Sequence, residues 1–136
     1  MSDTLFSEIK EIAIRARKAS LGLSSATTAE KNDALQAIAR GIESNRKLLK
    51  EENEKDLAMA EENGLSEAMV DRLRLTHERI DSMVKGLRQL IELPDPVGAV
   101  LETKERPNGL EINKVRVPIG VIGIIYESRP NVTIDC

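Results

Sequence analysis

The sequence predicts part of an α/β protein, with a helical region followed by strands. Residues 1–93 carry apolar side chains at the helical spacings of three and four. After Pro94 and Pro96 the pattern changes to short segments of strand type. The continuous apolar run 119–125 indicates a strand buried on both faces, as in parallel sheets. Because no later strand is present to pair with it, we expect an incomplete piece of a larger fold.

The helical region divides into several predicted helices. The first ends near Gly22, after an apolar stripe made by Leu5, Ile9, Ile12, Ala16 and Ala19. The second opens at Thr27, whose Thr-x-x-Glu spacing is that of a capping box. A third, charge-rich helix is capped by Ser44 and stops at Asn63-Gly64, because both of these residues tolerate the left-handed conformation. Its run 47–62 is expected to be a solvated helix face.

The rest of the chain is expected to hold a short helix, a longer helix and a hairpin. The short helix covers residues 66–73, and Thr76 caps the longer one, which ends before Pro94. Strands over 97–104 and 110–117 are joined by an Asn-Gly turn within 106–109.

Composition excludes several classes of function. The net charge is −3 and the only aromatic residues are Phe6 and Tyr126, which argues against nucleic-acid binding by charge or by stacking. A single cysteine allows no internal disulfide. The apolar run 119–126 is far shorter than the ~20 residues that cross a bilayer, and we see no signal peptide. We therefore expect a cytoplasmic protein that does not act at a membrane.

One segment carries a family resemblance. Residues 114–133 read KVRVPIGVIGIIYESRPNVT, and the YESRPNVT part is its most specific stretch. With the upstream segments 71–73, 78–80 and 93–98, this sequence resembles the γ-glutamyl phosphate reductases over essentially the whole chain. The resemblance implies the amino-terminal part of an aldehyde dehydrogenase-like fold.

The resemblance also implies an activity and a division of the chain. The family reduces γ-glutamyl phosphate with NADPH to glutamate 5-semialdehyde and phosphate, in proline biosynthesis. Residues 1–96 would be the helical part of the dinucleotide-binding domain, 97–117 part of an oligomerisation flap, and 118–136 the first strand and loop of the sheet. A homo-oligomer is expected of the full-length form, and glutamate 5-kinase is a candidate partner.

The loop after the apolar run is the predicted site, because ligands bind at the carboxyl ends of strands in open α/β sheets. Arg129 can hold a phosphate or carboxylate with two hydrogen bonds. The resemblance assigns the oxyanion of a tetrahedral intermediate to the amide of Asn131. Asn131 as a helix cap and Arg129 as a surface residue remain alternatives. Tyr126, Glu127 and Ser128 are the predicted cofactor contacts.

Other chemical groups are interpreted as structural. The family's cysteine nucleophile lies farther along, so Cys136 is expected to be an incidental thiol and the chain to be inactive alone. His77 is the only histidine, and we expect it at the surface rather than in a metal site. The alternative to an enzyme fragment is a non-catalytic helical interaction or regulatory module. A piece of a bifunctional synthase, in which a kinase precedes the reductase, is a third possibility.

Overall fold

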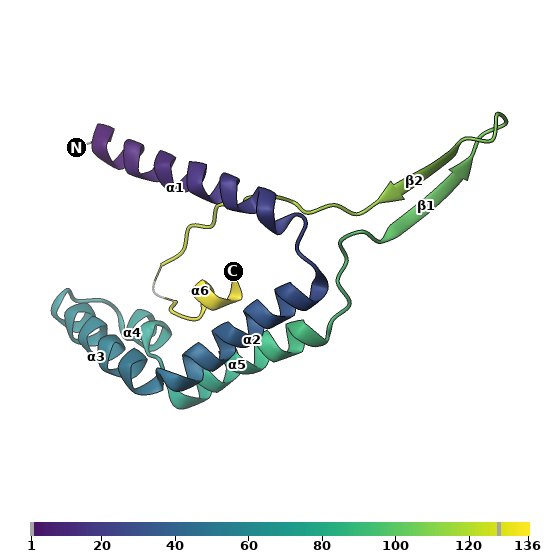
Figure 1. Cartoon of the computed structure of the whole chain (residues 1–136). Coiled ribbons are helices and arrows are strands. Elements are labelled where there is room, and N and C mark those ends of the chain that lie inside the picture. Colours follow the sequence, from purple (N-terminus) through teal and green to yellow (C-terminus); the bar gives the residue numbers. More distant parts are fainter. Residues whose placement is uncertain (1, 128) are drawn as a thin grey trace. The chain divides into compact units, whose positions relative to one another are not determined.

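A computed structural model describes residues 2–127 and 129–136 (Figure 1). The described elements, in chain order, are α1 (Ser2–Leu23), α2 (Thr28–Ser44), α3 (Arg46–Glu62), α4 (Glu67–Leu73), α5 (His77–Glu92), β1 (Val100–Glu105), β2 (Glu111–Val115) and α6 (Val132–Asp135). The predicted order of helices followed by a hairpin is confirmed. None of the helices in the described part of the chain is long and apolar enough to cross a membrane.

The chain folds as two compact units. One unit combines residues 1–28 with 94–123, and the other combines residues 29–93 with 124–136. The second unit therefore holds α2 to α5 together with α6. The predicted division at residues 96 and 117 concerns roles in a larger protein and stays a prediction.

The second unit has the main hydrophobic core. Helices α2 and α5 lie side by side (Figure 1) and supply most of its buried residues. The cluster consists of Ala39, Ile42, Leu75, Ile80, Met83, Val84 and Leu87. Ile80 is fully buried, and burial of such a side chain contributes about 1.5–3 kcal/mol. Ile134 of α6 packs against the same cluster, so the core also anchors the last helix.

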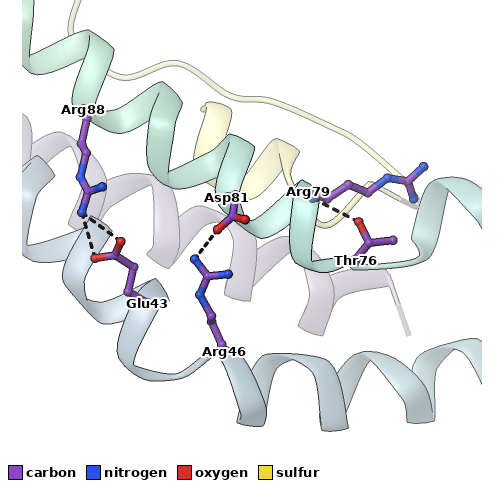
Figure 2. Close-up of polar contacts among 6 residues, drawn as sticks. All are labelled: Glu43, Arg46, Thr76, Arg79, Asp81 and Arg88. Atoms are coloured by element: carbon purple, nitrogen blue, oxygen red, sulfur yellow. Dashed lines mark hydrogen bonds and ion pairs between the residues drawn. The ribbon is translucent and has the colours of Figure 1, made fainter.

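Ion pairs connect α5 to its neighbours at the surface (Figure 2). Arg88 donates to both carboxylate oxygens of Glu43 on α2, at 2.9 and 3.1 Å. Arg46, at the start of α3, pairs with Asp81 of α5. Exposed pairs of this kind contribute about 0–1 kcal/mol, so we regard them as fixing the orientation of the helices more than their stability.

Most helix ends lie where local signals predicted them. The hydroxyl of Thr76 accepts a hydrogen bond from the Arg79 N–H at 3.2 Å (Figure 2), as a capping residue does. Gly64 follows α3 with a φ of 70°. The prediction for Ser44 is wrong: α2 continues through it, its hydroxyl donates to the Arg40 carbonyl at 2.8 Å, and Asn45 precedes α3.

Helix α3 is not solvated on all sides, contrary to the prediction for residues 47–62. Leu57 and Ala60 are buried with Val70 of α4 in a second small cluster. Asn53 is also buried, and both ends of its amide bond the link between α4 and α5. Its Nδ2 donates to the Leu73 carbonyl at 2.9 Å, and its Oδ1 accepts from the Leu75 N–H at 2.7 Å. This side chain therefore sets the path of the link.

The first unit contains the predicted hairpin. Strands β1 and β2 pair antiparallel, with Glu105 opposite Glu111 and an irregularity near Val100. The turn places Gly109 at a φ of 80°, a conformation that favours glycine. Every residue of both strands is exposed.

The buried strand predicted for residues 119–125 is wrong for this structure. The segment is irregular, and Ile119 and Ile125 are 88% and 102% exposed. A strand forms when its backbone groups pair with a neighbour, and the described residues pair no strand other than β1 with β2. The apolar stripe of α1 is exposed as well, with Ile9 at 57%.

Candidate functional site

A cleft of about 300 Å³ opens in the second unit, where the end of α4, the start of α5 and the segment 129–135 meet. It is lined by Arg72, Arg79, Ser82, Met83, Arg129, Asn131 and Asp135. Its volume lies at the lower end of the ~300–1,000 Å³ range of small-molecule sites. The two residues that the sequence analysis placed at the reaction centre, Arg129 and Asn131, therefore share one cleft.

The link between α4 and α5 positions two of the lining arginines. Arg72 lies in the last turn of α4, and Arg79 lies in the first turn of α5 after the Thr76 cap. The guanidinium of Arg79 donates to the carbonyls of Asp71 and Arg74, the latter at 2.6 Å. It also pairs with the Asp71 carboxylate at 3.0 Å. Arg79 is thus held in place by the end of the preceding helix.

The same cap affects a carboxyl group in the first turn of α5. Hydrogen bonds from its own backbone N–H and from the Thr76 hydroxyl lower the pKa of Glu78 below its ordinary value. Glu78 is therefore ionised at neutral pH. A negative charge at the start of a helix complements the helix dipole, so it favours the same boundary as the cap.

The last helix brings the predicted site residues to the cleft. Ile134 packs on the core, and the turn before α6 is closed by a bond from the Val132 N–H to the Arg129 carbonyl at 3.0 Å. A second backbone bond joins the Asp135 N–H to the Asn131 carbonyl at 3.0 Å. Core packing and local turn formation together place residues 129–131 against α5.

Asn131 precedes α6, but its side chain makes no capping hydrogen bond. Instead its Nδ2 donates to the Asp135 carboxylate at 2.8 Å. The amide carries two N–H groups, and this contact uses one of them. The carboxylate also fixes which end of the amide is the donor, since it can only accept. An amide held in this way is suited to donate its second N–H to an oxygen atom in the cleft.

The cleft is rich in positive charge. Within the described residues, neither Arg72 nor Arg129 has a carboxylate within ion-pairing distance of its guanidinium. The acidic residue of the lining, Asp135, is hydrogen-bonded to Asn131. No sequence pattern predicted Arg72, Arg79 or Asp135 as site residues. The first two lie in segments quoted for the family resemblance, which was the available signal.

Two of the predicted cofactor contacts, Tyr126 and Glu127, do not line this cleft. The hydroxyl of Tyr126 bonds the hydroxyl of Thr133, and Glu127 is exposed. Ser128 lies outside the described residues. The three residues therefore remain predicted contacts.

The two groups interpreted as structural are both at the surface. His77 is exposed, with its Nε2 3.2 Å from the Lys50 ammonium. Cys136 is a free, exposed thiol and does not line the cleft.

The chain is similar in sequence to several γ-glutamyl phosphate reductases. No family model matches the chain. A γ-glutamyl phosphate reductase of Geobacillus thermodenitrificans is 53% identical over 128 residues, which is 94% of this chain and 31% of the relative. One from Desulforapulum autotrophicum is 52% identical over 132 residues, or 97% of this chain and 32% of the relative. The chain thus spans about a third of the length of these relatives.

Solved structures agree. The crystal structure of γ-glutamyl phosphate reductase from Thermotoga maritima matches with a TM-score of 0.90 and 50% identity, covering 93% of this chain and 31% of that one. The enzyme from Saccharomyces cerevisiae matches with a TM-score of 0.88 and 36% identity, covering 92% of this chain and 32% of that one. These matches confirm the predicted helical region and hairpin of an incomplete α/β fold.

Proposed function

We propose that this chain, which belongs by sequence and fold to the γ-glutamyl phosphate reductases, forms the part of such an enzyme that binds and activates γ-glutamyl phosphate. The observation that carries the proposal is the cleft shared by Arg129 and Asn131. A guanidinium without a carboxylate partner and an amide donor held by Asp135 face one volume of small-molecule size.

In the proposed reaction, a nucleophile attacks the acyl carbon, the carbonyl oxygen gains negative charge and phosphate leaves. Arg129 neutralises the phosphate group with two parallel N–H···O bonds, because its fork matches the geometry of an oxyanion. The second N–H of Asn131 donates to the carbonyl oxygen as the charge develops. The family's thiolate nucleophile would come from the longer protein, since Cys136 does not line the cleft.

NADPH would supply the hydride of the reduction. Of the residues predicted to contact it, Tyr126 and Glu127 offer no cationic side chain for its phosphates. The carboxylate of Glu127 would repel its phosphates, and the hydroxyl of Tyr126 is already bonded to Thr133. We therefore assign to this chain the handling of the acyl phosphate, and we propose that the cofactor's phosphates are held by other parts of the longer protein.

Three further proposals follow from the same assignment. The isolated chain has no turnover, because the cleft contains no cysteine to act as the family's nucleophile. The exposed hairpin, β1 and β2, contributes to a homo-oligomer of the longer protein. The setting is proline biosynthesis in the cytoplasm, with glutamate 5-kinase as a candidate partner.

A chimera tests the proposal. The matching 128 residues of the G. thermodenitrificans enzyme are replaced by this sequence. Phosphate-dependent oxidation of glutamate semialdehyde with NADP⁺, the reverse reaction, is then measured. We expect the chimera to turn over and Asn131→Ala to lower kcat by about 10²–10³, with a smaller effect on KM, because an oxyanion donor acts in the transition state.

Two controls accompany the chimera. Gln89→Ala removes an exposed side-chain amide of α5 that does not line the cleft, and should leave kcat unchanged. An Asn131→Ala chimera with normal kcat would contradict the oxyanion role. The isolated chain should be inactive, and turnover by it that is lost on Cys136→Ser would make Cys136 the nucleophile. An inactive, folded chimera would favour the alternative of a non-catalytic module.

A further inference from the structure

Three arginines reach one cleft from three separate segments. Arg72 belongs to α4, Arg79 to α5, and Arg129 to the loop before α6. Other arginines of this unit are committed elsewhere: Arg46 and Arg88 each pair with a carboxylate on a neighbouring helix (Figure 2). Arg72 and Arg129 differ, because within the described residues neither has a carboxylate partner, whereas Arg79 pairs with the Asp71 carboxylate of the preceding helix.

Arg79 is preorganised and still has donors to offer. A guanidinium carries five N–H groups in a rigid fork. The described bonds of Arg79, to Asp71 and Arg74, use three of them. Those bonds fix the group before any ligand arrives, which reduces the entropy lost on binding.

Arg72 and Arg129 add two further positive charges to the lining of the cleft. Both are exposed, and within the described residues neither has a carboxylate at ion-pairing distance. Ser82 adds a hydroxyl to the lining, and the buried Met83 adds an apolar surface. Three guanidinium groups outweigh the one carboxylate of the lining, Asp135, so the cleft of about 300 Å³ matches a small oxyanion better than a cation or an apolar ligand.

We propose that Arg72 and Arg79 act with Arg129 as an oxyanion-binding site, so that this cleft takes a ligand carrying phosphate or carboxylate. Identifying that ligand as γ-glutamyl phosphate rests on the function proposed above, whereas affinity of the cleft for oxyanions does not. The substrate bears both a phosphate and an α-carboxylate. Arg72 and Arg79 thus provide further hydrogen-bond donors for these anionic groups, in addition to those of Arg129.

Binding to the 136-residue chain tests the site directly. Inorganic phosphate and glutamate are titrated separately, and the arginine side-chain signals are followed by NMR. We expect saturable shifts of Arg72, Arg79 and Arg129. The probe that binds more tightly identifies which oxyanion the arginines hold. Arg72→Gln should weaken that probe about tenfold, since a charge-assisted bond is lost from an exposed position.

Matched variants distinguish ligand binding in the cleft from a general effect of positive charge. Arg88→Gln removes the same charge from α5 outside the cleft and should leave the affinity unchanged. Arg79→Lys keeps the charge but removes the fork, and should weaken binding while circular dichroism confirms an intact fold. Equal affinities for the wild type, Arg72→Gln and Arg88→Gln would overturn the proposal, as would the absence of saturable shifts.

The chimera provides a second measurement if the isolated chain associates. There, Arg72→Gln should raise KM for phosphate in the reverse reaction about tenfold with kcat little changed. An active chimera whose KM does not respond would overturn the site and leave the proposed function standing. If the chimera is inactive but the isolated 136-residue chain binds phosphate through Arg72, the oxyanion site stands and the proposed function is overturned.

Discussion

Two isoleucines of the same chain have opposite environments. Ile80 of α5 is 0% exposed, whereas Ile125 in the irregular segment is 102% exposed. Ile80 belongs to the apolar stripe of a helix and Ile125 to a continuous apolar run, and both patterns predict burial. The difference comes from the backbone: a helix pairs its N–H and C=O groups within itself, so α5 needs only side-chain partners to bury a face. A strand needs a neighbouring strand first.

This difference between helix and strand explains which part of the fold forms within the described residues. Helices α2 and α5 meet and bury their stripes against each other. The segment 119–125 pairs with nothing in the described chain, so its apolar residues stay exposed. The relatives are about three times as long as the match. We infer that the partners of this segment belong to the remainder of such a longer protein.

The largest expected effect comes from truncating the buried isoleucine. Ile80→Ala should lower the free energy of unfolding by about 2–5 kcal/mol, because it leaves a cavity among the core residues. Ile125→Ala should change it by less than about 0.5 kcal/mol, as exposed substitutions do. Urea unfolding followed by circular dichroism measures both. Equal costs would show that Ile125 is buried in solution.

A smaller effect is expected at the buried polar contact between α3 and the link from α4 to α5. Asn53→Ala leaves the Leu75 N–H buried without its acceptor, so we expect a loss of about 1–3 kcal/mol. Glu54→Ala, at the exposed neighbouring position, is the control and should be close to neutral. Chemical denaturation of the two variants gives the comparison. An Asn53→Ala protein as stable as the control would mean that water replaces the amide.

The smallest expected effect concerns helix capping. Thr76→Ala removes an observed capping bond and should cost about 1 kcal/mol. Ser66 precedes α4 in the equivalent position but makes no side-chain capping bond, so Ser66→Ala should cost less. Thermal unfolding of both proteins tests the contrast. A larger loss for Ser66→Ala would show that the hydroxyl of Ser66 caps α4 in solution.

The elements that the sequence predicted correctly depend on local signals. The Thr76 cap, the stop at Asn63-Gly64 and the Asn-Gly hairpin each act within about four residues of chain. The strand at 119–125 was predicted wrongly, because an apolar pattern shows that a segment favours burial but does not supply what would cover it.

The cleft was predicted only in part for the same reason. Arg129 and Asn131 lie in the segment with the most specific resemblance, so they were found. Arg72 and Arg79 are brought to Arg129 by helix packing across fifty or more positions of the chain, which no local pattern encodes. Asn53 looked like one polar residue among many on a charged helix, and only its burial shows its importance.

The contacts of Asn53 also constrain how this sequence can vary. Both of its bonds go to main-chain atoms, the Leu73 carbonyl and the Leu75 N–H, so they survive a change of side chain at either partner. Asn53 itself has no equivalent substitute. Aspartate lacks the donor, leucine lacks both groups, and glutamine places its amide one methylene farther away. The two bonds should therefore differ in what they tolerate: a new side chain at either partner leaves the bonded main-chain atom in place, whereas position 53, twenty residues before Leu73, should require asparagine.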